Sequence, residues 1–489
     1  MSKRKDRSIR KKIDSIGCGA SMKVSSPLEV YKYLPKTNCG ECGEATCMAF
    51  AAQLIERTLT IEDCGPILDE KFKGDYEELT QVMAPQIRLV KIGSGENTVS
   101  IGGEDVLHRH QLTFYDKTAL AYDVWDTMGE EELVERVNVI QNFKKFYVGE
   151  FLTLDMVAIR STSGDPAQFA KCVKKVSETT DFPLILCSFD PKVLEAGLEE
   201  VSNKNPLIYA ATEKNWKEVA ELAIKYKTPV TVFAPDNLDT LKSLAKSFLE
   251  MGLEDIVLDP GTQPSGEGLV NSFSKFIQLR RAGISEDQKD IGLPLMSVPM
   301  TAWMANEDPV NAAYWETVIS SVFIVKYADI MILHSMEPYS TIPETTLTNN
   351  IYTDPRRPVQ VDSGVRAIGN PDEKSPVFVT TNFALTYYTV ESDISSNGID
   401  SYIVVVNTDG IGVEAAIAGG QFTPAKVNET LASADIKLED KVGHKTLVLP
   451  GLAARISGET EEVTGWNILV GPQDSGRIPG WMEGGWPPK

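Results

Sequence analysis

The sequence predicts an α/β protein of three parts: a small cysteine-rich module, a (β/α)8 barrel, and a C-terminal domain with an open, Rossmann-like parallel sheet. Four of the seven cysteines fall between residues 39 and 64, eight strand-and-helix units follow them, and four more such units end the chain. The 489 residues also exceed the roughly 250 to 300 that one core supports. We place the tail, module and tether at 1–91, the barrel at 92–340, a linker at 341–375 and the C-terminal domain at 376–489.

The charge of the chain excludes two classes of partner. Its formal net charge is -21 and its pI is near 4.8, so it repels phosphate backbones and anionic membranes. We therefore expect no nucleic acid as partner. Residues 1–24 are basic and read as a tail without the apolar stretch of a secretory signal, and no apolar run is long enough to cross a bilayer. A cytoplasmic location without a membrane partner is expected.

The spacing of the clustered cysteines, C-x2-C-x4-C-x16-C, favours a [4Fe-4S] cluster. Closely spaced cysteines with a following glycine let one loop wrap a face of the cluster, while the fourth thiolate returns after a short helix. Zinc is the competing metal, although its sites usually pair two C-x2-C knuckles. Disulfides are disfavoured by the odd cysteine total and the missing export signal. The predicted metal ligands are Cys39, Cys42, Cys47 and Cys64.

Residues 67–90 are charged and partly helical, and Pro85 interrupts their pattern. We read them as a tether. A small metal-bearing module on a tether suits an electron donor that approaches a second redox centre and then withdraws.

From residue 92 to 340, short apolar runs alternate with helix-length amphipathic stretches, which is the pattern of parallel strands joined by helices. Eight such units match a TIM barrel in number and length. The 92–112 stretch, with Gly102 and Gly103, is expected to form a hairpin that closes the barrel floor. The expected strands are 121–125, 156–161, 184–189, 207–211, 230–234, 256–258, 293–298 and 330–334.

Function in such barrels sits at the carboxyl ends of the strands. The polar residues there are Asp126, 188–190, Asp259-Pro-Gly261, 299–301 and His334-Ser335. They form no recognised catalytic set. Asp259-Pro-Gly261 is more typical of a turn, and His334 fits a hydrogen-bonded rim residue as well as a proton donor. From these residues, we expect the barrel to serve as a cap or scaffold.

The C-terminal domain alternates again, with strands expected at 377–381, 402–406, 446–449 and 468–470. A small polar or glycine-rich turn follows each strand. In open α/β sheets, such turns form the crevice that binds a ligand. The Asn407 to Gly412 turn lacks the dinucleotide-binding fingerprint. From the residues alone, these turns could therefore equally well be ordinary glycine-rich loops.

Several long segments resemble the large subunit of corrinoid iron-sulfur proteins, and most closely the gamma subunits of archaeal acetyl-CoA decarbonylase/synthase complexes. The resemblance covers nearly the whole chain beyond residue 24. The segments that carry it are 33–47, Asp259-Pro-Gly261, Thr301-Ala-Trp303, 380–387, 409–414, 450–455 and the Gly471-Pro472 turn.

The resemblance implies a cluster domain, a barrel and a corrinoid-binding domain, in that order. Its pattern places a base-off cobamide against Thr380, Thr386 and the 410–413 turn, near Ser475. Relatives carry hydroxyl residues where this chain has Glu414 and Ala415, which leaves the lower-face neighbour of cobalt open. With the other strand-end turns, the cofactor-binding candidates are Thr380, Asn382, Thr386, Gly410, Ile411, Gly412, Val413, Gly451, Leu452 and Ser475.

By the same resemblance, the chain is a methyltransferase component. Its cobalt, as cob(I)amide, accepts a methyl group from a methyl-tetrahydropterin, such as tetrahydrosarcinapterin or tetrahydromethanopterin, and exchanges it with the nickel centre of the acetyl-CoA synthase (beta) subunit. The cluster reduces the inactive cob(II)amide, and a smaller barrel subunit (delta) completes a heterodimer. Two alternatives remain: a barrel that itself binds the methyl-pterin as the full methyltransferase, and an electron-transfer or scaffold subunit without corrinoid.

No histidine is expected beneath the cobalt. Corrinoid domains that supply one use a D-x-H-x-x-G turn, and none of the four histidines fits it. Only His444 lies in the C-terminal domain, directly before a strand and hence at the end opposite the expected crevice.

Overall fold

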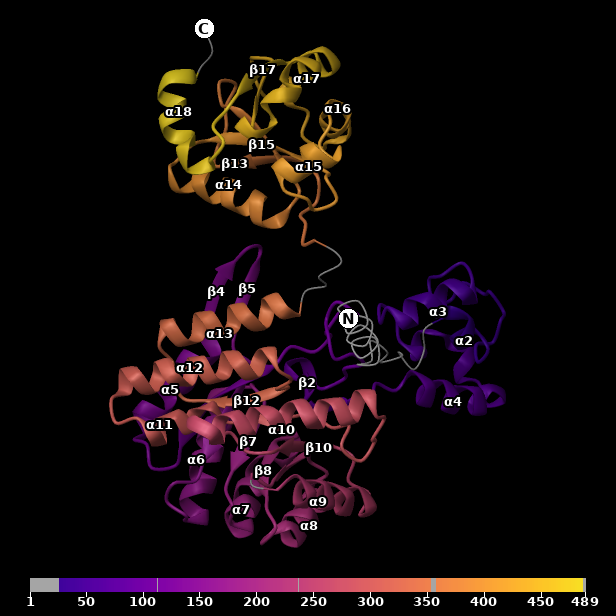
Figure 1. Cartoon of the computed structure of the whole chain (residues 1–489), viewed down its shortest axis with the longest axis vertical. Coiled ribbons are helices and arrows are strands. Elements are labelled where there is room, and N and C mark those ends of the chain that lie inside the picture. Colours follow the sequence, from indigo (N-terminus) through magenta and orange to yellow (C-terminus); the bar gives the residue numbers. More distant parts are fainter. Residues whose placement is uncertain (1–25, 112, 236, 353–357, 487–489) are drawn as a thin grey trace, which may run out of the picture. The chain divides into compact units, whose positions relative to one another are not determined.

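The computed structural model describes residues 26–111, 113–235, 237–352 and 358–486, so the predicted basic tail lies outside the described residues. The chain clusters into two compact units (Figure 1). The first contains the module and the barrel up to Tyr352, and the second contains the rest together with Lys145–Phe151. Within the described residues, no helix is long and apolar enough to cross a membrane.

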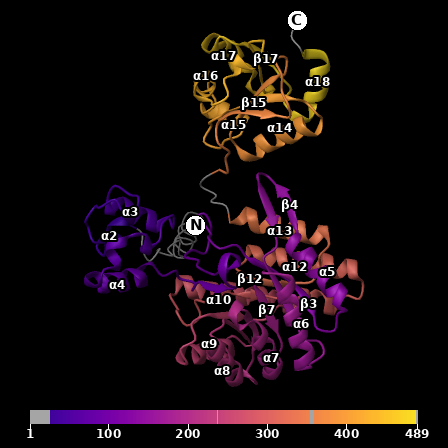
Figure 2. The same ribbon diagram turned by 180° about the vertical axis from the view of Figure 1, so that it is seen from behind.

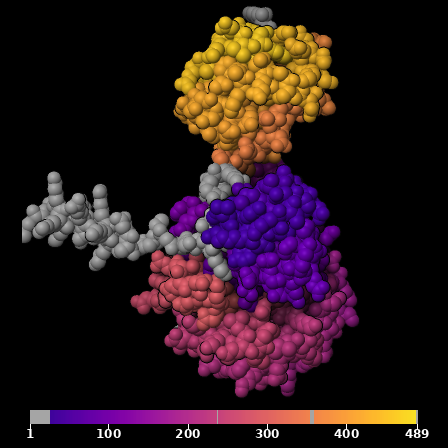
Figure 3. All heavy atoms as spheres, turned by 90° about the vertical axis from the view of Figure 1, so that its right-hand side faces the viewer, coloured from indigo at the N-terminus to yellow at the C-terminus, as the bar shows by residue number. Residues whose placement is uncertain are grey.

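The cysteine module packs three helices around its own core; Figure 3 shows it as a compact indigo body. The helices are α2 (Pro27–Tyr31), α3 (Cys47–Ile55) and α4 (Lys73–Met83). The Thr46 side chain accepts a hydrogen bond from the Ala49 N–H and so caps α3. Val30, Phe50 and Leu79 are buried together in the core.

The predicted tether is therefore mostly part of the module, because α4 buries Leu79 completely. The module also contacts the base of the barrel. The Arg57 guanidinium pairs with Asp105 and donates to the Gly103 carbonyl, and it lies 4.0 Å from the centre of the Tyr115 ring. The sequence did not reveal this anchor, since a lone arginine in a polar stretch carries no pairing signal.

Eight parallel strands form the barrel, in the order β10-β9-β8-β7-β6-β3-β12-β11, and a parallel bridge from Leu258 to Leu295 joins its two edges. All eight predicted strands are confirmed. They are β3 (Ala119–Trp125), β6 (Met156–Arg160), β7 (Leu184–Cys187), β8 (Leu207–Ala211), β9 (Val230–Phe233), β10 (Ile256–Asp259), β11 (Met296–Ser297) and β12 (Ile330–Leu333).

The floor of the barrel is a two-stranded hairpin, β1 (Val90–Ile92) and β2 (Val99–Ile101). Its buried residues Val90, Ile92 and Ile101 pack against the inward residues at the starts of the barrel strands. The predicted closing hairpin is thus confirmed, with its strands ending at Ile101.

Helices surround the strands, as the view from behind shows (Figure 2). They are α5 (Glu130–Asn142), α6 (Pro166–Thr179), α7 (Pro191–Val201), α8 (Trp216–Tyr226), α9 (Leu238–Glu250), α10 (Gly266–Ser285), α11 (Ala302–Ala305), α12 (Pro309–Val325) and α13 (Pro338–Ile351). An aspartate caps three of them in the same way: Asp165, Asp190 and Asp308 accept from first-turn N–H groups and are each followed by proline.

Part of the stretch expected as a linker, 341–375, forms regular secondary structure. Helix α13 continues to Ile351, with Pro343 inside it, and a further strand starts at Gly364. The buried face of α13 is polar, and Glu344 accepts hydrogen bonds from the Tyr122 hydroxyl at 2.9 Å and the Ser320 hydroxyl at 2.6 Å. A helix without an apolar stripe gives no periodic signal, which is why the sequence reading missed it.

The C-terminal domain is a five-stranded sheet in the order β13-β15-β14-β16-β17, with only β13 antiparallel. The strands are β13 (Gly364–Ile368), β14 (Val377–Thr381), β15 (Ser401–Val406), β16 (Thr446–Leu449) and β17 (Asn467–Val470). All four predicted strands are present, and β13 is an addition. The parallel strands have the doubly wound order in which the chain changes direction between β14 and β16.

Helices cover both faces of this sheet. One apolar core includes residues of α15 (Val413–Gly419) and α16 (Pro424–Ser433). The other includes residues of α14 (Ala384–Ser396) and α18 (Ile478–Gly485). Helix α17 (Ser457–Thr464) follows β16. The hairpin of β4 (Lys144–Tyr147) and β5 (Glu150–Thr153) was not predicted, and its Phe146 ring lies 5.7 Å from the Tyr388 ring of α14.

Candidate functional site

The four predicted cysteine ligands come from one loop and one return segment. Gly40 and Gly43, with φ of +76° and +85°, give the loop the left-handed turns that glycine adopts without strain. Nothing lies within 4 Å of a Cβ built on either glycine, so the loop is open beside them. The thiols are free and range from exposed to buried in the order Cys39, Cys42, Cys47 and Cys64.

The electrostatics show that these thiols are neighbours. Burial raises the pKa of Cys64, and the negative charges of the other three thiolates raise it further. The Asn38 N–H donates to Cys47 Sγ at 3.4 Å, while the Cys47 N–H donates to Asn38 Oδ1 at 2.9 Å. Four thiols whose charges act on one another, one of them with an N–H donor, suit an iron-sulfur cluster, whose iron replaces the thiol protons and whose sulfurs accept such bonds. The described chain holds no three His, Cys, Asp or Glu residues placed for a single metal ion.

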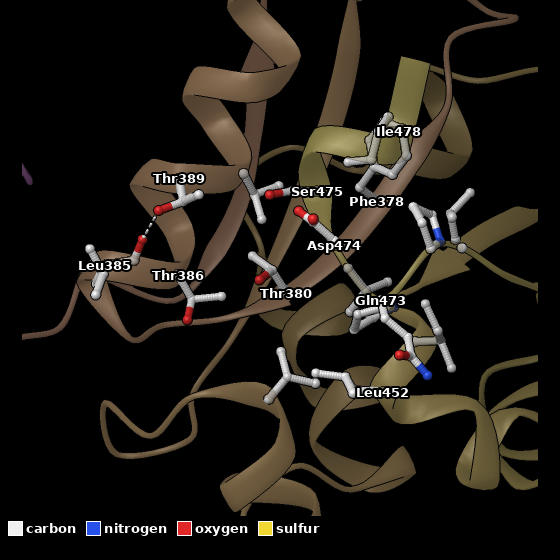
Figure 4. A pocket seen from close by; sticks show the side chains of 18 residues that line it. Phe378, Thr380, Leu385, Thr386, Thr389, Leu452, Gln473, Asp474, Ser475 and Ile478 are labelled. Atoms are coloured by element: carbon white, nitrogen blue, oxygen red, sulfur yellow. Dashed lines mark hydrogen bonds between the residues drawn. The ribbon is translucent and has the colours of Figure 1, made fainter. Parts of the chain in front are cut away.

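A cavity of about 400 Å³ opens in the C-terminal domain at the carboxyl ends of β14, β16 and β17. This is the change-of-direction point of the sheet, where open α/β folds bind ligands. The walls combine apolar side chains such as Val413, Val448 and Ile478 with hydroxyl groups (Figure 4). Leu385 and Leu452 also line it and are half-exposed.

Two hydroxyls of the cavity are free to meet a ligand. Among the described residues, none hydrogen-bonds the side chains of Thr380 or Thr386, although Thr380 is only 2% exposed. By contrast, the Thr389 hydroxyl donates to the Leu385 carbonyl and Ser475 donates to Asp393 Oδ2 at 2.5 Å. Polar atoms left unpaired inside an apolar crevice fit a large cofactor with an apolar face and polar side arms, such as the corrinoid that the resemblance implies.

The structure brings half of the cofactor-binding candidates together. Those that line the cavity are Thr380, Thr386, Val413, Leu452 and Ser475. Those that are not among its lining residues are Asn382, Gly410, Ile411, Gly412 and Gly451.

The remaining candidates shape the loops around the cavity. Asn382 Oδ1 accepts from the Thr408 N–H at 2.9 Å and the Gly410 N–H at 3.0 Å, which ties the turn after β14 to the turn after β15. Gly451 lets two loops touch, because a Cβ there would lie 2.8 Å from the Gln473 nitrogen. A Cβ on Gly412 would meet the Thr386 hydroxyl at 3.7 Å.

Sequence reasoning missed several lining residues. Leu385, Thr389 and Val390 join Thr386 on one face of α14, at the spacing of successive helical turns. Extending the Thr386 prediction along that helix face would have found them. Gln473 and Asp474 come from the Gly471 turn that the sequence had already marked.

His444 lies where the sequence placed it, before β16 and away from the cavity. Its Nε2 is 3.0 Å from the Ser375 carbonyl oxygen, and its ring meets the Trp486 ring edge-on. The cavity is lined by the opposite end of β16, Val448 and Leu449, and by Pro450 directly after it.

Most polar residues at the barrel mouth are engaged within their own loops. Asp126 accepts from the Thr162 and Ser163 N–H groups at 2.8 and 3.0 Å, and Asp190 caps α7. Asp259 accepts from the Gly261 N–H at 2.8 Å and the Tyr209 hydroxyl at 3.0 Å, which confirms a turn. Burial raises the pKa of Asp259 to about 7.

Comparison with known proteins gives the family. Residues 89–482 match a family model described as "CO dehydrogenase/acetyl-CoA synthase delta subunit". Residues 34–66 match one described as "Putative Fe-S cluster", which supports an iron-sulfur cofactor in the module. A dihydropteroate synthase structure from Thermus thermophilus is 14% identical, covers 54% of this chain and 98% of its own, and has a TM-score of 0.38.

Full-length relatives share one name. The acetyl-CoA decarbonylase/synthase complex subunit gamma of Methanosarcina acetivorans is 60% identical over 470 residues, which is 96% of this chain and 100% of that protein. The subunit gamma of Archaeoglobus fulgidus is 55% identical over 473 residues, again 96% and 100%. The chain therefore belongs to the CO dehydrogenase/acetyl-CoA synthase subunit family whose relatives here are gamma subunits of acetyl-CoA decarbonylase/synthase complexes.

Proposed function

We propose that the chain is the methyl-carrying subunit of an acetyl-CoA decarbonylase/synthase complex, with a base-off corrinoid in the C-terminal cavity and a [4Fe-4S] cluster on Cys39, Cys42, Cys47 and Cys64. The single observation that carries the proposal is the cavity at the change-of-direction point of the sheet, with unpaired hydroxyls on its walls. Full-length similarity to gamma subunits supports the complex.

When bound, the corrinoid supplies a cobalt nucleophile that carries a methyl group, and the cluster supplies a low-potential electron. The chain's own residues position these groups. Thr380 and Thr386 offer hydroxyls to polar arms of the cofactor, while Val413, Val448 and Leu452 cover its apolar surface and exclude water. In the module, the Asn38 N–H favours negative charge on Cys47 Sγ.

The proposed reaction is that of a methyl-tetrahydropterin:corrinoid/iron-sulfur protein Co-methyltransferase acting with a partner. The methyl donor is a methyl-tetrahydropterin, and the second reactant is the acetyl-CoA synthase (beta) subunit. A smaller barrel subunit (delta) forms a heterodimer with this chain. Residues 89–482 match a family model that is described as a delta subunit. This match supports a common ancestry of this chain and that partner.

Replacing both free hydroxyls tests the cofactor site. We expect Thr380→Val with Thr386→Val to weaken corrinoid binding by about 2 kcal/mol, roughly thirtyfold, because each lost hydrogen bond contributes about 1 kcal/mol. Valine matches threonine in shape, so the sheet should stay folded. Cobalt per chain, measured after anaerobic purification and dialysis against limiting corrinoid, gives the result.

Thr430→Val is the matched control, because its hydroxyl donates to the Lys426 carbonyl in α16, outside the cavity. Full cobalt occupancy in the double variant would move the corrinoid site elsewhere. A purified chain with iron-sulfur absorption but neither cobalt nor corrin bands would favour the electron-transfer or scaffold alternative.

A further inference from the structure

Three neighbouring barrel strands bring an acid-base group to the mouth of the barrel. Asp123 on β3, Arg160 on β6 and His334 directly after β12 meet at the carboxyl ends of these strands. Asp123 is fully buried; its Oδ1 lies 2.7 Å from His334 Nδ1, and its Oδ2 lies 2.7 Å from Arg160 Nε. Arg136 from α5 completes the set, 3.0 Å from Oδ1.

The charged groups around Asp123 keep its carboxyl group ionised. Burial alone raises the pKa of Asp123, but the hydrogen bond and charge of His334, with the charges of Arg160 and Arg136, hold that pKa below its usual range. An ionised Asp123 keeps a proton on His334 Nδ1, so Nε2 is the nitrogen that can exchange a proton.

The second ring nitrogen of His334, Nε2, is not engaged by the described part of the chain. Within the described chain, no residue hydrogen-bonds this nitrogen, and the side chain is 23% exposed. The ring lies edge-on to the Trp303 ring with centroids 4.4 Å apart, and 5.7 Å from the Trp125 ring. Arg160 and Arg136 lie over the Trp125 ring, at 5.5 and 5.7 Å.

A buried glutamate holds this arrangement in place. Glu316 on α12 accepts from Trp303 Nε1 at 2.9 Å and from the N–H groups of His334 and Ser335 at 2.7 and 2.9 Å. The Thr301-Ala-Trp303 segment and His334, which the cofactor cavity does not use, thus belong to one site. Its charged and titratable groups are Asp123, Arg136, Arg160, Glu316 and His334.

We propose that the barrel mouth binds the nitrogen heterocycle of the methyl donor beside the group of Trp125, Trp303 and His334, and that His334 Nε2 donates a proton to the departing nitrogen. This inference rests on the proposed methyl-carrying function. It gives the barrel an active role in place of the cap or scaffold expected from the sequence.

Methyl transfer from a ring nitrogen needs such a proton. The N–CH3 bond breaks, the methyl group goes without its bonding pair to the nucleophilic cobalt of the proposed cofactor, and that pair stays on nitrogen. The nitrogen takes the proton from Nε2, and the imidazolium becomes neutral imidazole, which regains a proton from water. An amide anion is too basic to leave unprotonated at neutral pH. Asp123 is a positioning residue that stabilises the imidazolium.

Calorimetry on the full chain produced without corrinoid tests the site apart from turnover. Methyl-tetrahydromethanopterin is titrated at neutral pH in two buffers of different ionisation enthalpy, which yields both affinity and proton uptake. The wild type should bind and take up a fraction of a proton, because the ring nitrogen accepts a hydrogen bond from a protonated His334 Nε2. His334→Gln should bind less than about tenfold more weakly and take up none.

His110→Gln, an exposed histidine outside the mouth, is the matched control and should behave as the wild type. Absence of binding by the wild-type chain, or unchanged proton uptake in His334→Gln, would overturn the proposal. Melting by circular dichroism confirms that each variant is folded, and Asp123→Asn gives a second variant in which binding persists while proton uptake falls.

The corrinoid-loaded chain supplies the kinetic readout. The methyl-transfer rate of the wild type should fall at alkaline pH, because the proposed acid acts only when it carries a proton, and His334→Gln should be about 10²- to 10⁴-fold slower and lack that fall. An unchanged rate and pH profile would refute the acid role. A chain that holds no cobalt would contradict the proposed function, while the calorimetry would still decide whether the mouth binds the heterocycle.

Discussion

His444 is the histidine of the C-terminal domain, and its ring is already engaged by the Ser375 carbonyl and Trp486. Its place before β16 follows from strand direction alone, because a residue ahead of a parallel strand lies at the end opposite the ligand crevice. The described structure agrees with that placement.

We therefore predict that cobalt in this chain has no histidine ligand. Without a nitrogen donor from the protein, the cobalt of the proposed corrinoid would be easier to reduce, so that an electron from an iron-sulfur cluster would suffice. The electron paramagnetic resonance spectrum of the cobalt(II) state should lack nitrogen splitting and stay unchanged in His444→Ala. A triplet splitting that disappears in the variant would identify His444 as the axial ligand and overturn this account.

Single residues differ in how far the sequence reveals them. Cys39, Cys42, Cys47 and Cys64 are evident because metal chemistry requires thiolates and their spacing is local. Asn382 was read as a cofactor contact, yet its side chain joins two loops. The pairing of His334 with Asp123 spans 211 positions in the chain, so no local pattern could show it.

At the scale of elements, the buried parallel strands were predictable, whereas β13, the β4–β5 hairpin and the burial of helices α4 and α13 were not. Strands of a parallel sheet are buried on both faces and read as apolar runs. Helix α13 instead buries Ser340, Thr341 and Glu344, and α4 has one fully buried leucine among charged residues. Their burial depends on partners far along the chain, which apolar periodicity does not encode.

The buried polar face of α13 leads to a prediction about how the stability of the folded chain depends on pH. Burial, with the charge of Glu316 adding to it, raises the pKa of Glu344 to about 8. The folded chain then holds a proton that the unfolded chain releases above about pH 4.5. This contribution to stability is fully present below that pH and is lost as pH rises through about 8.

Glu344→Gln removes that dependence, since glutamine stays neutral. Relative to the wild type, we expect the variant to gain about 1.4 kcal/mol per pH unit between about pH 4.5 and 8, roughly 2 to 4 °C in Tm per unit, and to gain nothing further above pH 8. Thermal melts at pH 5, 6, 7 and 8 measure it, with the exposed Glu307→Gln as control. A Tm difference between variant and wild type that stays constant across these pH values would show that Glu344 is ionised throughout.

At the scale of the whole molecule, the proposed cluster and corrinoid sites belong to different parts of one chain, each with its own apolar core. Neither the clustered cysteines nor the C-terminal cavity, taken alone, indicates what the protein does. The proposed methyl carrier would need a reductant whenever it is oxidised, and the proposed cluster in the same chain would supply the electron. The mouth of the barrel also carries a group of acid-base side chains, which only the folding of the chain brings together.

Cys47→Ser separates the two cofactors. Cys47 is the buried first residue of α3, and serine keeps its size and its N–H bond to Asn38, so the module and barrel should stay folded. Iron content should fall while cobalt content is retained, because the two sites share no residue. Reductive reactivation of oxidised protein should slow by at least about tenfold, since the weaker oxygen ligand impairs the cluster.

Methyl transfer from a centre that is already methylated should persist at the wild-type rate, because that step needs no electron from the cluster. Cys172→Ser is the control: Cys172 is buried in α6 of the barrel, outside the module, and its replacement should leave iron and reactivation unchanged. Rapid-quench transfer from pre-methylated protein, with reactivation followed by corrin absorption, gives both rates. Loss of transfer in Cys47→Ser with cobalt still bound would mean that the cluster takes part in each turnover rather than only in reactivation.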